Sequence, residues 1–337
     1  MIDVKELSKN YQISRRTVGL GAAMKQFLSP TYDTVQAIHN LSFHIDPGEI
    51  VGYMGPNGAG KSTTIKVMSG ILTPDSGHCL IDGRVPWTDR KRHVAQIGVV
   101  FGQRSQLWWD TPVIDSFYLL KEIYKIPEKS FKKTFSLLVE TLNLNSLLET
   151  PVRQLSLGQR MRCEVAASLI HEPKILFLDE PTIGLDAISK IAIRDFIQTI
   201  NKEKNVTVIL TTHDTSDLEA LCKRVLLIGK GEILYDGNFE SLKNDISPER
   251  YIDIKTASAS ESFEVEKLFS YEILEGHKTI ELLHKEKNQL RLKFDPRNTS
   301  VSTLLKGISD QVEIIDLEVS SAPVDEMIAR LYKVHQL

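Results

Sequence analysis

Cysteine is scarce in this chain of 337 residues, and long apolar runs are absent. The three cysteines, Cys79, Cys163 and Cys222, have no paired spacing, which argues against a disulfide framework or a metal site and suits the cytosol. No apolar run approaches the roughly 18 residues of a membrane span, and residues 1–6 lack the pattern of a signal peptide. If the protein acts at a membrane, we expect another chain to do the spanning.

A strong charge of either sign is also lacking. The chain has 41 basic and 44 acidic residues, for a net charge of -3, and 42% of its residues are hydrophobic. This balance gives no general basic surface for nucleic acid, so no nucleic-acid partner is expected. The length suits one large domain and a small one.

A glycine-rich stretch at residues 55–63 fits the phosphate-binding pattern G-x-x-x-x-G-K-[ST]. It reads Gly55, Pro56, Asn57, Gly58, Ala59, Gly60, Lys61, Ser62 and Thr63. An apolar strand-like run precedes it at 49–54, and helical spacing follows at 64–69. Such a turn directs backbone N–H groups at one anion. We expect Lys61 to reach the β- and γ-phosphates and the Ser62 hydroxyl to bind Mg²⁺.

Strand and helix patterns alternate around this loop, which predicts an α/β fold with a mostly parallel, doubly wound sheet. An antiparallel β subdomain, a helical subdomain at 104–170 and an insertion at 12–36 in the first hairpin complete a domain at 1–240. Apolar residues at 20, 24, 27 and 28 predict an amphipathic helix in that insertion. Short alternating strands and two helices predict a small α+β accessory domain at 243–337.

Polar residues follow three further strands. Asp179 and Glu180 end an apolar strand, where Asp179 is a candidate Mg²⁺ ligand and Glu180 a candidate general base for an attacking water. His213 follows the next buried strand and is a candidate contact for the γ-phosphate. Gln103, after the strand at 94–101, is a candidate for the metal and the attacking water.

Together these residues resemble the ATP-binding subunit of ABC transporters over about residues 1–237. Six motifs occur in the family's order. They are the P-loop at 55–63, the Q-loop Gln103, the signature at 155–159, the Walker B strand at 175–180, the D-loop at 184–186 and the switch His213.

The resemblance implies an ATPase that acts as a head-to-tail dimer, either of two copies or with a related ATPase. Each ATP, with Mg²⁺, would lie between one P-loop and the other copy's signature, where Ser156, Gly158 and Gln159 stand, with Asp186 in the D-loop. ATP would close the dimer and hydrolysis would open it. The motion would reach an integral membrane permease, with this chain peripheral at the cytoplasmic face of the cell membrane.

Two positions depart from the family's pattern. Leu157 occupies a signature position that is usually glycine. The aromatic residue that stacks on adenine normally lies in the first hairpin, where the insertion separates Tyr11 from Tyr32. Tyr11 keeps the usual lead-in and is favoured, whereas Tyr32 keeps the usual spacing to the next strand, so the choice stays open.

The sequences at 103–110 and 155–161 resemble bacterial ATPases related to viologen and multidrug exporters, and the tail at 319–332 is similar to that of drug-export ATPases. Export of an unknown substrate through a separate permease is therefore the preferred hypothesis. The alternatives are a polysaccharide- or teichoic-acid-export ATPase, an importer subunit, and a soluble ABC ATPase acting on ribosomes or DNA. One cassette without sustained heptads at 64–154 disfavours the last of these.

Overall fold

The chain forms two compact units, Met1–Phe239 and Glu240–Leu337. The computed structural model describes residues 1–14, 32–102, 104–212, 214–246, 249–257, 263–265, 268, 280–321, 326 and 330–333. The helix α9 (Phe239–Ile246) begins at the boundary between the units. The assignment of the units as an ATPase domain and an accessory domain stays a prediction.

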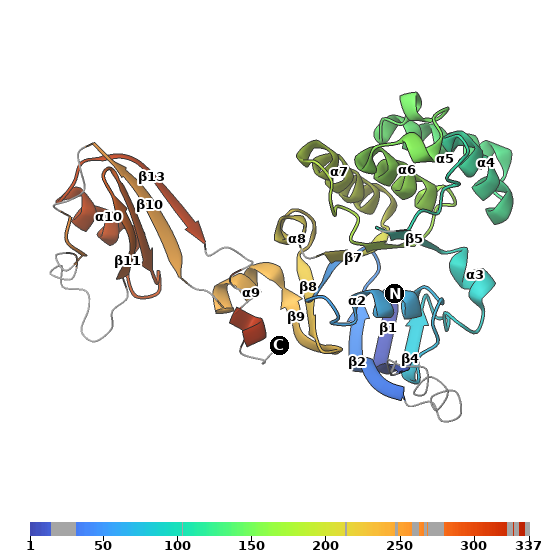
Figure 1. The fold of residues 1–337 in the computed structure, drawn as a ribbon, viewed down its shortest axis with the longest axis horizontal. Coiled ribbons are helices and arrows are strands. Elements are labelled where there is room, and N and C mark those ends of the chain that lie inside the picture. Colours follow the sequence, from blue (N-terminus) through green and yellow to red (C-terminus); the bar gives the residue numbers. More distant parts are fainter. Residues whose placement is uncertain are drawn as a thin grey trace, which may run out of the picture. The chain divides into compact units, whose positions relative to one another are not determined.

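Six strands form the main sheet of the first unit (Figure 1), in the spatial order β5-β6-β7-β3-β8-β9. They are β5 (Ile97–Phe101), β6 (Ile175–Asp179), β7 (Thr207–Thr212), β3 (Ile50–Met54), β8 (Arg224–Gly229) and β9 (Glu232–Asn238). All neighbours are parallel except β8 and β9. The central strands β6 and β7 are buried almost throughout, as is usual for parallel strands whose two faces are both covered. This confirms the predicted doubly wound α/β fold.

A second, antiparallel sheet lies beside the first, in the order β2-β1-β4. Its strands are β1 (Ile2–Ser14), β2 (Tyr32–Ile45) and β4 (Ser76–Ile81). Their apolar residues share one core with β3 and with α2 (Lys61–Met68), in which Ile2, Ile45, Tyr53 and Ile65 are fully buried. The phosphate-loop helix is therefore held between the two sheets.

Most of the remaining helices of the first unit lie above β5 and β7 in Figure 1. They are α3 (Arg90–Val94), α4 (Val113–Tyr124), α5 (Glu128–Thr141), α6 (Leu157–Leu169), α7 (Ala187–Lys204) and α8 (Thr215–Leu221). Rings of Phe117, Phe131 and Phe135 pack between α4 and α5, with centroids 5.2–5.3 Å apart. Helices α4, α5 and α6 fall within residues 104–170, where the sequence predicts a helical subdomain.

The first hairpin extends farther than the sequence predicts. We expected an insertion at 12–36, but β1 continues to Ser14 and β2 resumes at Tyr32. Gln12 pairs with Thr34 and Ser14 with Tyr32, so both ends of that segment belong to the antiparallel ladder. The boundary was wrong because these polar strand ends carry no strict apolar alternation. The amphipathic helix expected around residues 20–28 lies outside the described residues.

The second unit contains a four-stranded antiparallel sheet, in the order β11-β12-β10-β13. Its elements are β10 (Arg250–Thr256), β11 (Ile280–Glu286), β12 (Gln289–Phe294), α10 (Val301–Ser309) and β13 (Ile314–Ser321). Because β10 lies between β12 and β13 and is antiparallel to both, β12-α10-β13 is a split βαβ unit. Of the helix expected at the end of the chain, the structure describes residues 326 and 330–333.

No helix within the described part of either unit has both the length and the apolar character needed to cross a membrane.

Candidate functional site

The phosphate loop links the buried strand β3 to α2. Gly58 and Gly60 have φ values of 84° and 105°, which residues with a side chain rarely adopt. A Cβ atom at Gly60 would also lie 2.3 Å from the carbonyl oxygen of Ala37 in β2. Behind the loop, the hydroxyl of Tyr53 donates to Thr64 Oγ1 at 3.1 Å, joining β3 to α2. The glycines therefore allow a tight turn that places the helix N-terminus, with its free N–H groups, at an anion site.

The side chain of Lys61 lies within this loop and is 6% exposed. Its ammonium donates to the carbonyl oxygens of Gly55 at 2.7 Å and Pro56 at 3.2 Å. Burial lowers the pKa of Lys61, and the nearby carboxylates of Glu180 and Asp179 act in the opposite direction. A positive charge is thus held between the loop backbone and two acidic side chains.

The two acidic residues stand where β6 ends, beside β7. The hydroxyl of Thr211 donates to Asp179 Oδ1 at 2.6 Å, and the backbone N–H of Glu180 donates to the Thr211 carbonyl at 3.1 Å. Glu180 has a φ of 54°, a strained conformation for a residue with a side chain, which turns the chain out of the sheet. Sequence reasoning missed Thr211, although its place two residues before His213 on the neighbouring strand was a usable signal.

These elements meet around one pocket of about 600 Å³. Most of the residues predicted from the P-loop and Walker B motifs line it. They are Asn57, Gly58, Gly60, Lys61, Ser62, Thr63, Asp179 and Glu180. Of the rest of the loop, Gly55 and Pro56 contact Lys61, while Ala59 is buried and accepts from the Gly231 N–H at 3.1 Å.

Several lining residues were not predicted, among them Val35, Ala37, Lys66, Gly102 and Arg104. Gln103 and His213 lie outside the described residues, so their predicted roles at the γ-phosphate and the metal stay predictions. The residues on both sides of position 103 do line the pocket.

The signature and D-loop residues form a separate cluster, which does not line this pocket. Ser156 caps α6: its hydroxyl accepts from the Gln159 N–H at 3.2 Å, and the Gln159 side chain accepts from the Ser156 N–H at 2.9 Å. Asp186 caps α7 and accepts from Ser189 N and Oγ, both at 2.9 Å, which lowers the pKa of that carboxyl. A Cβ atom at Gly158 would lie 2.4 Å from Ser189 Oγ, so the two helix starts touch there.

The register of the first hairpin separates the two candidate aromatic residues. Val35, which lines the pocket, pairs with Tyr11. Paired residues of an antiparallel ladder share a face, so Tyr11 lies beside Val35 on the pocket side. Tyr32 is three residues from Val35, and strand residues alternate between faces, so it lies on the opposite face. The geometry thus favours Tyr11 as the aromatic contact for a base, while neither tyrosine is part of the pocket lining.

The donors of the pocket suit Mg²⁺, which prefers oxygen ligands and commonly combines one or two protein ligands with substrate phosphates. The Ser62 hydroxyl and the Asp179 carboxylate both line the pocket. Over the described residues there is no group of three His, Cys, Asp or Glu side chains that could hold a metal by itself.

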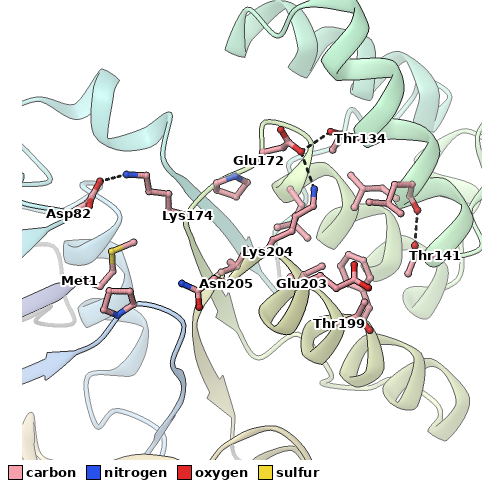
Figure 2. A pocket seen from close by; sticks show the side chains of 18 residues that line it. Met1, Asp82, Thr134, Thr141, Glu172, Lys174, Thr199, Glu203, Lys204 and Asn205 are labelled. Carbon is pink, nitrogen blue, oxygen red and sulfur yellow. Dashed lines mark hydrogen bonds and ion pairs between the residues drawn. The ribbon is translucent and has the colours of Figure 1, made fainter.

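A second cavity, of about 540 Å³, lies between α5, α7 and the ends of β6 and β7 where these strands begin (Figure 2). Its apolar lining includes Leu138 and Phe196. Its polar rim is paired: Lys204 Nζ donates to Glu172 Oε1 at 3.0 Å, and Lys174 Nζ donates to Asp82 Oδ2 at 2.8 Å. None of the motif residues that the structure describes lines it.

The comparisons with known proteins agree with this geometry. The family model described as "ABC transporter" matches residues 38–183. The ABC transporter ATP-binding protein NatA of Bacillus subtilis (strain 168) is 32% identical over 208 residues, 62% of this chain and 84% of that protein. The probable multidrug ABC transporter ATP-binding protein YbhF of Escherichia coli (strain K12) is 34% identical over 66% of this chain and 39% of its own length. The linearmycin resistance ATP-binding protein LnrL of Bacillus subtilis (strain 168) is 29% identical over 70% of this chain and 75% of its own length.

Among solved structures, the dimeric post-hydrolysis state of the ATP-binding cassette MJ0796, bound to ADP and Pi, superposes with a TM-score of 0.59. It is 25% identical, over 71% of this chain and 98% of that one. The match to NatA, over most of that protein's length, carries more weight than the structural likeness. With a phosphate loop and two strand-end carboxylates around one pocket, this chain belongs to the ABC transporter ATP-binding proteins and is an ATPase of that family.

Proposed function

We propose that this chain hydrolyses ATP as a head-to-tail dimer and thereby powers export through a separate membrane permease. The main observation in favour of a dimer is that two functional clusters are separate within one copy. Ser156 and Gly158 do not line the pocket that contains Lys61 and Glu180. A signature helix that is to act on ATP must therefore act in another copy's pocket. The dimeric structure of the MJ0796 cassette with ADP and Pi also supports a dimer.

The pocket residues would have separate roles in ATP binding and hydrolysis. The loop N–H groups and Lys61 would bind the β- and γ-phosphates, and Tyr11 would stack on the adenine. Glu180 would accept the proton of the attacking water, with Gln103 and His213 assisting at the γ-phosphate as in the family. Ser62 and Asp179 would hold Mg²⁺, which would neutralise charge on the phosphates. Ser156, Gly158, Gln159 and Asp186 would complete the site from the second copy.

Export is inferred from relatives, because two of those named above are a probable multidrug ABC transporter protein and a linearmycin resistance protein. The chain would then lie at the cytoplasmic face of the membrane, held there by the permease. Substrate choice would reside in that permease, since a site, and not a fold, determines specificity.

The test is co-purification from detergent-solubilised membranes with ATP present, using a tagged Glu180→Gln variant that should bind ATP without releasing it as ADP. The matched control carries Lys61→Ala as well and should not close on ATP. A polytopic membrane protein recovered with the first variant and lost with the second supports the proposal. Ribosomal or DNA-associated proteins in place of a membrane protein would refute it in favour of a soluble ABC ATPase.

A further inference from the structure

One buried carboxylate joins the pocket to the signature helix. Glu164 lies in α6 and is 3% exposed. Both of its oxygens are used: Ser105 Oγ donates to Oε1, and the Gln106 N–H donates to Oε2 at 3.1 Å. The Gln106 side chain also donates to the Glu164 carbonyl oxygen at 2.8 Å. Residues 105 and 106 are therefore fastened to α6 by three hydrogen bonds.

Residues 105 and 106 belong to a short segment, residues 102–109, that begins at the nucleotide pocket. Gly102 and Arg104 line that pocket, and the Gly102 N–H donates to the Asp179 carbonyl oxygen at 2.8 Å. The segment thus leaves the end of β5, next to the end of β6 where the candidate catalytic carboxylates stand, and reaches Glu164 within a few residues. At its far end the Trp108 N–H donates to Ser116 Oγ in α4 at 3.0 Å.

The other end of the link is the signature. Glu164 is eight residues after the capping residue Ser156, a rise of about 12 Å along a continuous helix. A helix of this length moves as a rigid rod, so a displacement at Glu164 is carried to Ser156. Arg160, between them, lies over the Trp109 ring at 5.6 Å and adds a second contact between the segment and α6.

Burying a carboxylate costs free energy unless its oxygens are hydrogen-bonded, so the presence of Glu164 at a buried position requires an explanation. Burial raises the pKa of Glu164, and the donors from Ser105 and Gln106 oppose this. An apolar side chain would fill the same space at lower cost but would not fix the direction of the segment. Fully satisfied polar contacts specify one geometry.

We infer that Glu164 is a positioning residue: through Ser105 and Gln106 it sets the orientation of the signature helix relative to the nucleotide pocket of the same copy. The inference rests on the proposed head-to-tail dimer, because only there does the signature act on ATP. The contacts of one copy's pocket with its own nucleotide are then independent of Glu164, while closure onto the second copy depends on it.

The test uses Glu164→Gln in the Glu180→Gln background. The amide keeps the volume but supplies one acceptor oxygen and a donor that faces the donors of residues 105 and 106. We expect the nucleotide affinity of the monomer, measured with a fluorescent ATP analogue, to stay within about twofold, and the ATP concentration for half-maximal dimerisation to rise roughly fivefold. Ser105→Ala, which removes one donor and keeps the carboxylate, should act in the same direction and serves if Glu164→Gln does not fold.

Thr134→Val is the matched control, because Thr134 lies in α5 of the same subdomain, is also 3% exposed and also gives up one hydrogen bond, to Glu172. A purely structural role of Glu164 predicts equal effects of the two substitutions on dimerisation at equal loss of thermal stability. That result, or an unchanged midpoint in both Glu164→Gln and Ser105→Ala, would overturn the inference. If the parental Glu180→Gln chain stays monomeric with ATP, the proposed dimer itself is wrong and the inference falls with it.

Discussion

Two cavities of similar volume lie in the first unit, and they differ in chemistry. The pocket at the phosphate loop, about 600 Å³, gathers a buried ammonium, two carboxylates and the start of a helix. The cavity of about 540 Å³ between α5 and α7 is lined largely by apolar side chains, and its Lys174 and Lys204 are ion-paired with acidic residues (Figure 2). Volume therefore does not identify a functional site here. The functional site is identified instead by polar and charged groups that lie together where the backbone is strained or requires glycine.

The largest expected effect comes from removing the positive charge of the first pocket. Lys61→Ala should weaken ATP binding roughly 100-fold, because a charged hydrogen-bond donor to phosphate is lost from a buried position. Isothermal titration calorimetry with ATP measures this directly. Lys66→Ala is the control, since Lys66 lines the same pocket from the last turn of α2. Equal losses in the two variants would mean that general positive charge, and not the loop ammonium, binds the nucleotide.

Removing a carboxylate should separate chemistry from binding. Glu180→Gln should lower kcat for ATP hydrolysis roughly 100-fold or more while ATP affinity is kept, because general base catalysis is lost without a change of shape. The control, Glu172→Gln, alters an ion-paired carboxylate of the second cavity and should leave kcat unchanged. Phosphate release at saturating ATP is the measurement. A Glu180→Gln enzyme with parental turnover contradicts the assignment of the base.

A smaller effect distinguishes the two tyrosines of the first hairpin. Tyr11→Ala should raise the KM for ATP about tenfold, the size expected for loss of one base–aromatic stack. Tyr32→Ala should leave KM unchanged, since Tyr32 lies on the opposite face of the hairpin from Val35. Steady-state kinetics on the two variants decide the matter, and a larger effect at Tyr32 would reverse the assignment.

The sequence predicts the first pocket well because its parts are contiguous. Residues 55–63 supply the loop, and the apolar run before Asp179 and Glu180 supplies the strand end. The doubly wound sheet follows from the alternation of strand and helix, and the structure confirms it. Local order was enough for these features, since each depends on neighbours along the chain.

Features that depend on distant segments were not predictable. Thr211 contacts Asp179 across 32 residues, and Ser105 contacts Glu164 across 59. The choice between Tyr11 and Tyr32 depends on strand register, which shifts at irregular positions between Val4 and Asn10. The second cavity is lined by six separate stretches of the chain, and no described residue of the six motifs lies in its lining. Such contacts arise from packing, which a single sequence does not reveal.

The smallest expected effect comes from the rim of the second cavity. Lys204→Met should remove the ion pair with Glu172 and lower the free energy of unfolding by about 0.5 kcal/mol, the size usual for a partly exposed pair, with no change in kcat. The hydrogen bond from Lys204 lowers the pKa of Glu172 in the folded state. The pair therefore stabilises the fold above the ordinary carboxyl pKa of the unfolded chain, and this contribution is lost as the pH falls through the lowered value. Urea unfolding of the parent and the variant at neutral pH and in acid should show a difference that disappears in acid. If the difference in the free energy of unfolding persists in acid, the Lys204 side chain stabilises the fold by packing on the apolar lining and not through its ion pair. The rim of the second cavity would then contribute to stability in the same way as its apolar interior.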